Sequence, residues 1–353
     1  MTEFSAFDHA MMRRALDLAA KGLYTTTPNP RVGCVVCRDG QVLGEAWHEH
    51  AGGPHAEAAA LAGIDAGGAT VYVNLEPCSH HGRTPPCVAA LIKARVRRVV
   101  VAMRDPNPLA AGGGEALRTA GIAFEHGLLE DEARELNIGF ISRVTRQRPW
   151  VRLKVAATLD GRTALRDGRS QWITGPDARR DGHRWRARAC AILTGIGTVR
   201  ADDPQLTVRE VATPRQPLHV IVDSRLETPR EARVLHGERA LVFAAREGAL
   251  PNAEVVALPN ASGKVDLPRM LHALAERGVN ELHVEAGFRL NGSLVRESCV
   301  DEFLIYLNAS VLGDGADGML DLPAPATLEE RRRLRLVSVE RLGDDLRLLA
   351  RAR

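Results

Sequence analysis

Three potential metal ligands restrict the fold of the first half of this chain more than any other feature. They are His55, Cys78 and Cys87, with 22 residues between the first two and eight between the last two. One imidazole and two thiolates are good zinc ligands, so these distant positions are expected to meet in one site. Three protein ligands leave the fourth tetrahedral position to water, which is typical of catalytic zinc. The sequence therefore predicts a compact domain built around a catalytic zinc ion.

The residues next to these ligands indicate a hydrolytic site. Glu57 lies two positions after the first ligand, where it could reach a zinc-bound water without binding the metal. A glutamate that shuttles protons without binding zinc is typical of zinc deaminases. His55 and Cys87 are each expected to open a helix, and a helix N-terminus favours a thiolate. A closed structural zinc site remains an alternative, with four histidines as possible fourth ligands: His48, His50, His80 and His81.

A second pair of cysteines has the Cys-x-x-Cys spacing of many metal and redox sites. Cys34 and Cys37 lie within a predicted buried strand. Residues three apart in a strand point to opposite faces, so these two thiols cannot hold one metal ion. Both are expected to be small core residues. With no secretory signal expected, the six cysteines are interpreted as thiols or ligands and not as a disulfide framework.

The composition is that of a globular protein with two domains. The chain has 353 residues, and a domain typically takes about 150. Hydrophobic residues make up 45% and charged residues 26%, which excludes a disordered chain. No apolar run approaches the roughly 20 residues of a membrane span, and the expected location is the cytoplasm. A formal net charge of +3 without a long basic block argues against a nucleic-acid partner.

Alternating helix and strand signals predict an α/β fold in both halves. In the first half, Asp8 is the expected N-cap of a helix over 9–21. Further helices are expected at 55–66, 86–94, 115–120 and 130–145, with strands at 32–37, 42–47, 69–75, 98–103 and 122–124. Asp39-Gly40 is the expected hairpin turn between the first two of these strands. In the second half, strands are expected at 150–157, 191–194, 218–223, 240–244, 281–285 and 302–307, with helices at 177–189 and 267–277. The polar segment 143–149 separates the expected domains, residues 1–146 and 147–353.

Two glycine-containing turns follow apolar strands in the second half. Gly195-Ile196-Gly197-Thr198 follows one strand, and the segment 285–293 repeats the order of strand, glycine turn and helix start. Backbone N–H groups in such turns can bind phosphate, so a dinucleotide could lie across the strand ends. The full Gly-x-Gly-x-x-Gly pattern is absent, and two ordinary loops remain an alternative. Lys154 lies in an apolar strand, and it is one of four lysines in a chain with 43 arginines. A lysine at this position indicates either a site that needs a compact ammonium group or a side chain whose stem packs along the strand.

The longer motifs resemble the bifunctional deaminase-reductases of riboflavin biosynthesis. In the first half the resemblance rests on segment 27–34 (TPNPRVGC), on His-Ala-Glu at 55–57, on segment 76–87 (EPCSHHGRTPPC) and on Asp-Pro-Asn-Pro at 105–108. In the second half it rests on segments 154–162, 170–174 and 198–209 and on Val-Asp-Ser at 222–224. The run over 76–87 is highly specific, and the resemblance extends from about residue 8 to about residue 320.

For the first half, the resemblance implies a cytidine-deaminase-like domain that removes an amine from a diaminopyrimidinone bearing a phosphoribosylamino group. One zinc ion per chain would be held by His55, Cys78 and Cys87, and water would attack the electron-poor ring carbon C2. Glu57 would carry protons to the ring nitrogen and to the departing ammonia. The resemblance also implies five substrate contacts. Asn29 and His48 would contact the pyrimidine, and the ribose phosphate would be held by Arg83, Asp105 and Asn107.

For the second half, the resemblance implies a dihydrofolate-reductase-like domain that uses NADPH to reduce the ribosyl group to ribityl. Hydride would go to the sugar C1′, with Lys154 as the catalytic residue. NADPH would be bound by Ala156, Trp172, Thr198, Asp202, Ser224 and the loop Gly287, Phe288, Arg289, Leu290, Asn291, Gly292 and Ser293. The substrate would be bound by Ser170, Arg186, Leu206, Arg209 and Glu285. Ser224, with Arg225 beside it, is expected to select the 2′-phosphate of NADPH.

Other functions stay open at this point. One is a zinc deaminase of free nucleosides or tRNA whose second domain binds without reducing. Another is a nucleic-acid-binding protein with a structural zinc ion, although phosphate binding needs a localised basic patch. For the bifunctional enzyme, the partners expected are the small-molecule substrate and further copies of the same chain, as a dimer or tetramer, with no membrane.

Overall fold

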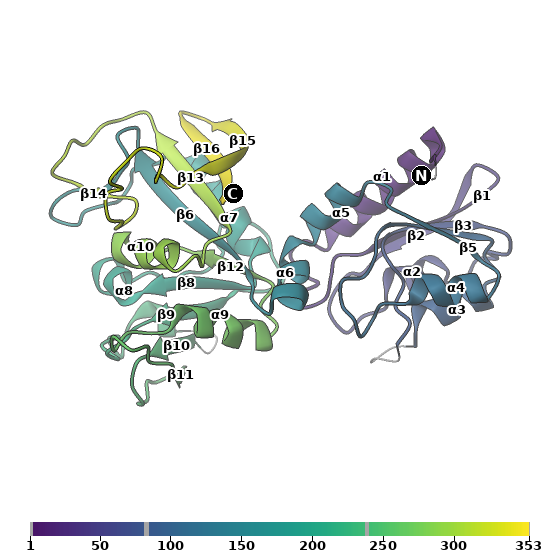
Figure 1. The fold of residues 1–353 in the computed structure, drawn as a ribbon, viewed down its shortest axis with the longest axis horizontal. Coiled ribbons are helices and arrows are strands. Elements are labelled where there is room, and N and C mark those ends of the chain that lie inside the picture. The colour runs from purple at the N-terminus through teal and green to yellow at the C-terminus, as the bar shows by residue number, and fades with distance from the viewer. Residues whose placement is uncertain (1–2, 81–84, 237–239, 353) are drawn as a thin grey trace. The chain divides into compact units, whose positions relative to one another are not determined.

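The chain folds into two compact units. The computed structural model describes residues 3–80, 85–236 and 240–352, and its units are Met1–Gln147 and Arg148–Arg353 (Figure 1). The expected boundary was after residue 146. Each unit has hydrophobic clusters of its own and is described here by itself.

The first unit is a five-stranded sheet with helices on both faces. The strand order is β2-β1-β3-β4-β5, with β1 antiparallel to its neighbours and β3, β4 and β5 parallel. The strands are β1 (Gly33–Arg38), β2 (Gln41–Trp47), β3 (Thr70–Leu75), β4 (Arg98–Met103) and β5 (Ala123–His126). The predicted hairpin turn joins β1 and β2, with both Asp39 and Gly40 at positive φ. Valine-rich central strands are buried on both faces, as in other covered parallel sheets.

The helices of this unit divide between the two faces of the sheet. One face packs against α2 (Ala56–Ala60), α3 (Cys87–Lys93) and α4 (Gly113–Thr119). The other packs against α1 (Ala6–Lys21), α5 (Glu130–Leu136) and α6 (Ile138–Arg146). Because successive strand residues alternate between faces, β1 contributes Cys34 and Val36 to the first cluster and Val35 and Cys37 to the second. The prediction that the two cysteines are core residues on opposite faces is confirmed.

Three helix predictions in this unit need correction. The N-cap of α1 is Ser5, and Asp8 sits three residues on, where its carboxylate completes a capping box. The helix expected over 55–66 ends at Ala60, because Gly63 soon takes a left-handed conformation that a helix cannot continue through. The helix expected over 130–145 is broken at Asn137, whose side chain bonds the backbone of Arg31.

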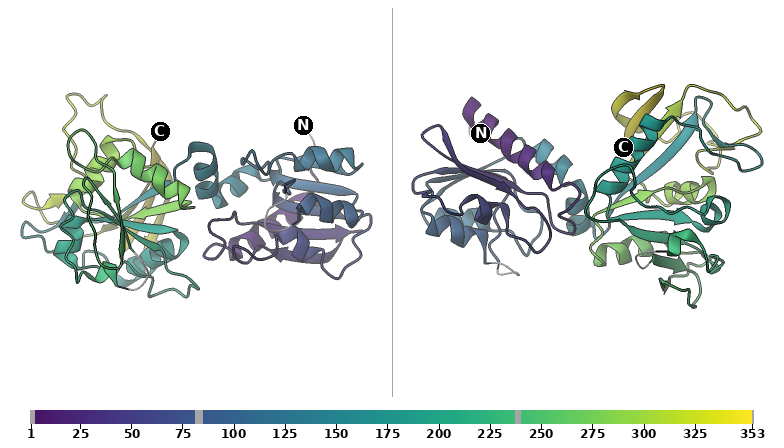
Figure 2. Two further views of the ribbon diagram at one scale, coloured as in Figure 1. Left: turned by 90° about the horizontal axis from the view of Figure 1, so that it is seen from below. Right: turned by 180° about the vertical axis from the view of Figure 1, so that it is seen from behind.

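The second unit is built on a nine-stranded mixed sheet. The strand order is β11-β10-β9-β8-β12-β6-β13-β16-β15, parallel from β11 to β13 and antiparallel at the last two strands (Figure 1). Figure 2 shows the same unit from two further sides. The strands are β6 (Trp150–Thr158), β8 (Ala191–Gly195), β9 (Leu218–Val222), β10 (Ala240–Ala244), β11 (Ala253–Ala257), β12 (Glu281–Val284), β13 (Glu302–Asn308), β15 (Leu334–Leu342) and β16 (Asp345–Ala352). Two short strands, β7 (Arg162–Ala164) and β14 (Asp317–Gly318), pair separately.

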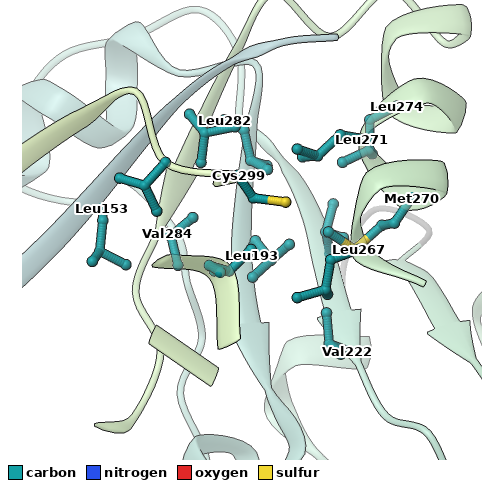
Figure 3. Packing of buried hydrophobic residues seen from close by; sticks show 14 of the residues in the cluster. Leu153, Leu193, Val222, Leu267, Met270, Leu271, Leu274, Leu282, Val284 and Cys299 are labelled. Carbon is teal, nitrogen blue, oxygen red and sulfur yellow. The ribbon is translucent and has the colours of Figure 1, made fainter. Parts of the chain in front are cut away.

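The two faces of this sheet differ in character. One face forms the largest apolar cluster, with α9 (Leu267–Glu276) and α10 (Phe288–Arg296) packed on it (Figure 3). The other face packs against α8 (Ile196–Asp202) and the short 3₁₀ helix η1 (Arg233–Leu235), and toward β13 against α7 (Pro176–Arg188). The hairpin of β15 and β16 was not predicted, because exposed charges interrupt its apolar alternation. No described helix is both long and apolar enough to cross a membrane.

A buried ion-pair network lies on the face of the second sheet that α7 covers. The guanidinium of Arg152 is 1% exposed and bonds the carboxylates of Glu281 on β12 and Glu302 on β13. Arg188 donates to Glu281 at 2.7 Å, and Arg351 donates to Glu302 at 2.9 Å. Every buried carboxylate of the network therefore has at least two guanidinium partners, which offsets the cost of removing it from water.

Removing the central cation of this network should destabilise the second unit. Arg152→Met fills similar space but leaves Glu281 and Glu302 each short of one partner, which should cost about 3–5 kcal/mol. Urea unfolding followed by tryptophan fluorescence measures this, since three of the four tryptophans, Trp150, Trp172 and Trp185, lie in this unit. The exposed Arg335 provides the control, and Arg335→Met should change the free energy of unfolding by less than about 0.5 kcal/mol. Equal stability of both variants would contradict the importance of the network.

Candidate active sites

The predicted metal ligands meet in the first unit. The Nδ1 atom of His55 lies 3.2 Å from Sγ of Cys87 and 3.6 Å from Sγ of Cys78. All three ligand atoms lie within 4.8 Å of one another, and this is the one such group among the residues that the structure describes. Two sulfurs and one imidazole nitrogen at these separations fit a zinc ion. Neither His48 nor His80 belongs to the group, and His81 lies outside the described residues.

Two helix N-termini hold these ligands. His55 is the N-cap of α2, and Cys87 is the first residue of α3, as the sequence predicted. The backbone N–H of Cys87 donates to Sγ of Cys78 at 3.4 Å, which favours negative charge on that sulfur. A hydrogen bond from the Cys87 thiol further lowers the pKa of Cys78. The same hydrogen bond raises the pKa of the Cys87 thiol, so the thiolate charge of the cluster is favoured at Cys78.

Glu57 lies in the first turn of α2, beside the ligand cluster. Its side chain is buried, and burial raises the pKa of its carboxyl above the ordinary value. His55 and Cys78 of the cluster and Glu57 line one cavity of about 430 Å³, a volume typical of small-molecule sites. A carboxyl group that binds no metal and shares a cavity with a three-ligand cation site is placed to exchange protons there.

Asn29 and His48 lie together in the same cavity. His48 Nδ1 lies 2.9 Å from the carbonyl oxygen of Pro54, so Nδ1 carries the proton. Its Nε2, 3.0 Å from the Asn29 amide nitrogen, then accepts a hydrogen bond. Burial lowers the pKa of His48, which favours this neutral form. The pair presents a fixed set of polar atoms beside the ligand cluster.

Two buried amides hold the segment that carries Asn29. The side chain of Asn137 accepts the backbone N–H of Arg31 at 2.8 Å and donates to its carbonyl oxygen at 3.0 Å. Asn74 on β3 donates to the same carbonyl at 2.9 Å and accepts the N–H of Gly33 at 2.8 Å. The prolines at positions 28 and 30 lack an N–H group, so this segment cannot pair as a regular strand. The two amides, unassigned in the sequence analysis, therefore fix its path.

A second loop brings Asp105 and Asn107 into the cavity. Asp105 accepts the N–H of Asn107 at 2.8 Å, and burial raises the pKa of its carboxyl to about 6. The buried Glu76 anchors this loop, because its carboxylate accepts the N–H groups of Asp105 at 3.1 Å and of Gly114 at 2.8 Å. Glu76 belongs to the motif over 76–87, which was the available signal, but no role was predicted for it. Arg83 lies outside the described residues.

The predicted polar residues of the second unit meet where β12 ends beside the middle of β6. The Glu285 carboxylate, which follows β12, receives two bonds from the Arg186 guanidinium, one of them 2.8 Å long. Lys154 Nζ on β6 lies 4.0 Å from Oε2 of the same carboxylate, the oxygen that accepts the 2.8 Å bond from Arg186. Burial lowers the pKa of the Lys154 ammonium, while Glu285 opposes that shift. Ammonium, carboxylate and guanidinium thus form a compact polar site on the face covered by α7.

His283, two residues before Glu285, is a further member of this cluster that the sequence analysis missed. Its ring is fully buried, and Nε2 lies 3.3 Å from Oε1 of Glu285. Burial lowers the pKa of His283. The signal was available in the alternation of Glu281, His283 and Glu285 along β12, because alternate strand residues share one face.

The two predicted glycine turns lie beside each other. Gly195 caps α8 and Gly287 caps α10, so both turns open helices at the ends of parallel strands. A Cβ atom on Gly195 would lie 3.0 Å from the Leu290 side chain, and one on Gly287 would lie 3.5 Å from Oγ1 of Thr198. Thr198 and the loop 287–293 are thereby brought together.

The other predicted contacts lie around this centre. Ala156 is on β6, Asp202 ends α8, and the Ser224 hydroxyl after β9 accepts the N–H of Val265 at 3.2 Å. Ser170 and Trp172 lie between β7 and α7, where the exposed Trp172 ring stacks on Arg179. Leu206 is buried, and the backbone of Arg209 bonds His183 of α7.

Family comparisons assign each unit separately. Residues 5–103 match the family model described as "Cytidine and deoxycytidylate deaminase zinc-binding region". Residues 149–348 match the model described as "RibD C-terminal domain". The metal cluster falls within the first match, and the Lys154–Glu285 cluster falls within the second.

Relatives with similar sequence and structure cover nearly the whole chain. Riboflavin biosynthesis protein RibD of Haemophilus influenzae is 44% identical, covering 99% of this chain and 98% of the relative, and the Escherichia coli protein is 44% identical over 96% and 98%. The structure of Acinetobacter baumannii RibD, form 1, superimposes with a TM-score of 0.91 at 41% identity, covering 98% and 99%. A diaminohydroxyphosphoribosylaminopyrimidine deaminase/5-amino-6-(5-phosphoribosylamino)uracil reductase from Thermotoga maritima gives 0.90 at 36% identity, with the same coverage.

The ligand geometry predicts one zinc ion per chain. Cys87→Ala should lower the zinc content from one ion to nearly none after washing with a mild chelator, because two ligands hold zinc poorly. Cys34→Ala removes a thiol that is buried in the hydrophobic cluster between the sheet and α2, α3 and α4, and it should leave the zinc content unchanged. Elemental analysis of the purified full chain measures both, and zinc retained by Cys87→Ala would exclude this ligand set.

Proposed function

The chain belongs to the family of the riboflavin biosynthesis protein RibD, and from this premise we propose how its residues divide two reactions between the two units. It is a bifunctional enzyme of riboflavin biosynthesis, with a zinc deaminase domain followed by a reductase domain. One observation supports our assignment above all others. The His-Cys-Cys cluster with Glu57 and the Lys154–Glu285–Arg186 cluster are complete in separate units.

The first unit hydrolyses the ring amine of 2,5-diamino-6-(5-phosphoribosylamino)pyrimidin-4(3H)-one. A bound zinc ion supplies the acidity that makes water a nucleophile near neutral pH. Glu57 takes a proton from the attacking water and passes protons to the ring nitrogen and to the departing ammonia. Its buried carboxyl, with a raised pKa, supports this exchange in both directions. The neutral His48 keeps the Asn29 amide oriented toward the pyrimidine edge.

The ribose phosphate end of this substrate lies toward the loop that Glu76 anchors. Asp105 and Asn107 line the cavity there and offer polar atoms to the sugar. The turn in which Asp105 accepts the Asn107 N–H sets the spacing of the two side chains. Arg83 is assigned to the phosphate from the family resemblance alone.

The second unit reduces the ribosyl group to ribityl, giving 5-amino-6-(5-phosphoribitylamino)uracil. NADPH supplies the hydride that is delivered to the sugar C1′. Lys154 donates a hydrogen bond to a sugar oxygen, and Glu285 holds the ammonium in place while Arg186 fixes Glu285. Ser170, Leu206 and Arg209 complete the substrate contacts. The ion pairs among Lys154, Glu285 and Arg186 hold these side chains in fixed positions, which supports a site that orients an open-chain sugar.

The adjoining glycine turns fit NADPH. Their backbone N–H groups open α8 and α10, and helix N-termini stabilise phosphate charge. The absence of side chains at Gly195 and Gly287 lets the two turns approach Leu290 and Thr198. Ala156, Trp172, Asp202 and Ser224 are assigned to the remaining parts of the coenzyme.

The edge of the second sheet supports the expected association of identical chains. Strand β15 has one neighbour, β16, and carries exposed apolar side chains on its surface: Leu334, Leu336, Val337 and Val339. Exposed apolar edge strands tend to pair with another chain. We therefore place the homo-oligomer contact at β15.

The two activities should be separable by single substitutions. Glu57→Gln preserves the side-chain shape but cannot cycle a proton, so deamination should fall at least about 10²-fold. It should keep zinc and still reduce the deaminated intermediate when NADPH is supplied. Lys154→Ala should show the reverse, with deamination intact and the deaminated intermediate accumulating. Each half-reaction is assayed by the mass of its product.

Each of these two variants is the control for the other, because each should retain the reaction that the other loses. If folded Glu57→Gln also failed to reduce supplied intermediate, the assignment of one reaction to each unit would be wrong. If neither half-reaction were detected in the unmodified chain, the proposed substrate itself would be wrong.

Ser224 and Arg225 should select NADPH over NADH. A hydroxyl and a guanidinium directly after β9 can meet a 2′-phosphate through charge-assisted bonds. Arg225→Ala should therefore reduce kcat/KM for NADPH about tenfold with little change for NADH. Arg246, exposed after β10, gives the control variant Arg246→Ala. Equal use of the two coenzymes by the unmodified chain would refute the preference.

A further inference from the structure

We propose that His283 is a positioning residue of the reductase site, where its neutral imidazole donates a hydrogen bond from Nε2 to the carboxylate of Glu285. This bond holds the carboxylate beside the Lys154 ammonium while the sugar is reduced. The inference rests on the proposed function, because it explains how residues assigned to that reaction keep their places. His283 is not among the catalytic, coenzyme or substrate contacts assigned above.

The imidazole of His283 is buried without a regular hydrogen bond. Its exposed fraction is 0%, and neither Nδ1 nor Nε2 has a hydrogen-bond partner of regular geometry among the residues that the structure describes. Buried polar groups are normally hydrogen-bonded, because an unpaired one has lost its contacts with water. The adjacent strand residues, Leu282 and Val284, are apolar and belong to the core on the other face (Figure 3). An apolar side chain at position 283 would avoid this cost, so the imidazole points to a function.

The ring lies within reach of the Glu285 carboxylate. Nε2 is 3.3 Å from Oε1, just beyond the roughly 2.7–3.2 Å of an ordinary N–H···O bond. A lone pair on Nε2 at this distance would be repelled by the carboxylate, so the tautomer with its proton on Nε2 is favoured. His283 thus offers a donor to Oε1.

The surroundings of His283 keep its ring neutral. The ring lies opposite Arg152 on β6 and opposite the apolar Ile192 on β8. Burial is the main cause that lowers the pKa of His283, and the guanidiniums of Arg152 and Arg186 add to it, while Glu285 opposes them. The titratable and charged groups on this face come from three elements. They are Glu281 and Glu285 on β12, Arg152 and Lys154 on β6, and His183, Arg186 and Arg188 on α7.

The two oxygens of Glu285 have different neighbours. Nη2 of Arg186 donates to Oε2 at 2.8 Å, and Nζ of Lys154 lies 4.0 Å from the same oxygen. Oε1 accepts a bond from Nε of Arg186 and faces His283. The guanidinium fork sets the plane of the carboxylate. A donor at Oε1 anchors the end of the carboxylate that is remote from Lys154, so Oε2 stays beside the ammonium.

The protonation of two groups depends on this anchor. Burial raises the pKa of Glu285, but the charge of Arg186 above all and the hydrogen bond from His283 hold it well below its ordinary value. Burial lowers the pKa of the Lys154 ammonium, and the ionised Glu285 opposes that shift. His283 therefore acts on Lys154 through Glu285.

The test replaces the imidazole with side chains that differ in hydrogen bonding. His283→Leu fills the space without a donor, and kcat for reduction of the deaminated intermediate should fall about tenfold with KM changed less than about twofold. The loss falls on kcat because a displaced carboxylate misplaces Lys154 in the transition state. His283→Gln keeps an N–H donor but cannot become charged, and its kcat should stay within about threefold of the unmodified chain.

The pH profile of reduction separates positioning from packing. With the carboxylate displaced, the pKa of the Lys154 ammonium falls, and the proton that it needs as a donor is lost at lower pH. The basic limb of the kcat profile should therefore move to lower pH in His283→Leu and stay in place in His283→Gln. A purely structural role would lower the free energy of unfolding in urea without moving this limb.

His219 provides a matched control. It is a buried histidine on β9, two strands from His283 in the same row of the sheet, and its Nδ1 lies 3.0 Å from the carbonyl oxygen of Val234. His219→Leu removes an imidazole remote from Glu285, so kcat and the pH profile of reduction should be those of the unmodified chain. Deamination by the first unit measures the fraction of intact protein in every variant.

Nitrogen-15 NMR of the imidazoles tests the tautomer in the unmodified chain. The chain has 12 histidines, and the signal of His283 is the one absent from the His283→Gln spectrum. This signal should show a neutral ring with its proton on Nε2 between about pH 6 and 8.

Three outcomes would overturn the proposal. Unchanged kcat in folded His283→Leu, or an equal loss in His219→Leu, would mean that the imidazole does not position the site. Equal losses in His283→Leu and His283→Gln would exclude a role as a hydrogen-bond donor. A ring that is charged, or protonated at Nδ1 alone, would exclude the proposed bond. Failure of the proposed function would show separately, as no reduction by the unmodified chain.

Discussion

The second unit depends on the burial of charge along one face of its sheet. Glu281, His283 and Glu285 point to this face from β12, while Leu282 and Val284 point to the apolar core. At the start of the strand, Glu281 is neutralised by Arg152 and Arg188 and serves stability. At its end, Glu285 is shared between Arg186 and Lys154, the residues to which we assign the reductase reaction. One strand thus carries both the structural and the functional ion pairs.

The fold of the first unit instead brings two cysteine sulfurs and one imidazole together. Two short helices achieve this, because α2 and α3 both start at a ligand and lie on the same face of the sheet. The position of Glu57 follows from the same arrangement, since it lies in the first turn of α2. The loops before β1 and after β4 supply Asn29 and Asp105 to the cavity.

Local sequence patterns predicted most of this architecture. The central strands, the hairpin at Asp39 and Gly40 and the two ligand-bearing helix starts follow from periodicity and turn residues. The break at Asn137 could not be predicted, because it depends on a hydrogen bond to Arg31, 106 residues away. Glu76 and His283 were missed although each had a signal in the sequence, the motif over 76–87 for Glu76 and the alternation along β12 for His283. Strand β15 was missed because its exposed surface carries charged and apolar side chains together.

The amides of Asn74 and Asn137 have a consequence for how this enzyme can change over evolution. They bond the backbone of the segment before β1 and not its side chains. The path of that segment is therefore set from outside, by residues on β3 and between α5 and α6. Substitutions within the segment can alter the polar atoms that it presents to the cavity while its course stays the same. The ligand preference of this site can therefore change in evolution without destabilising the fold.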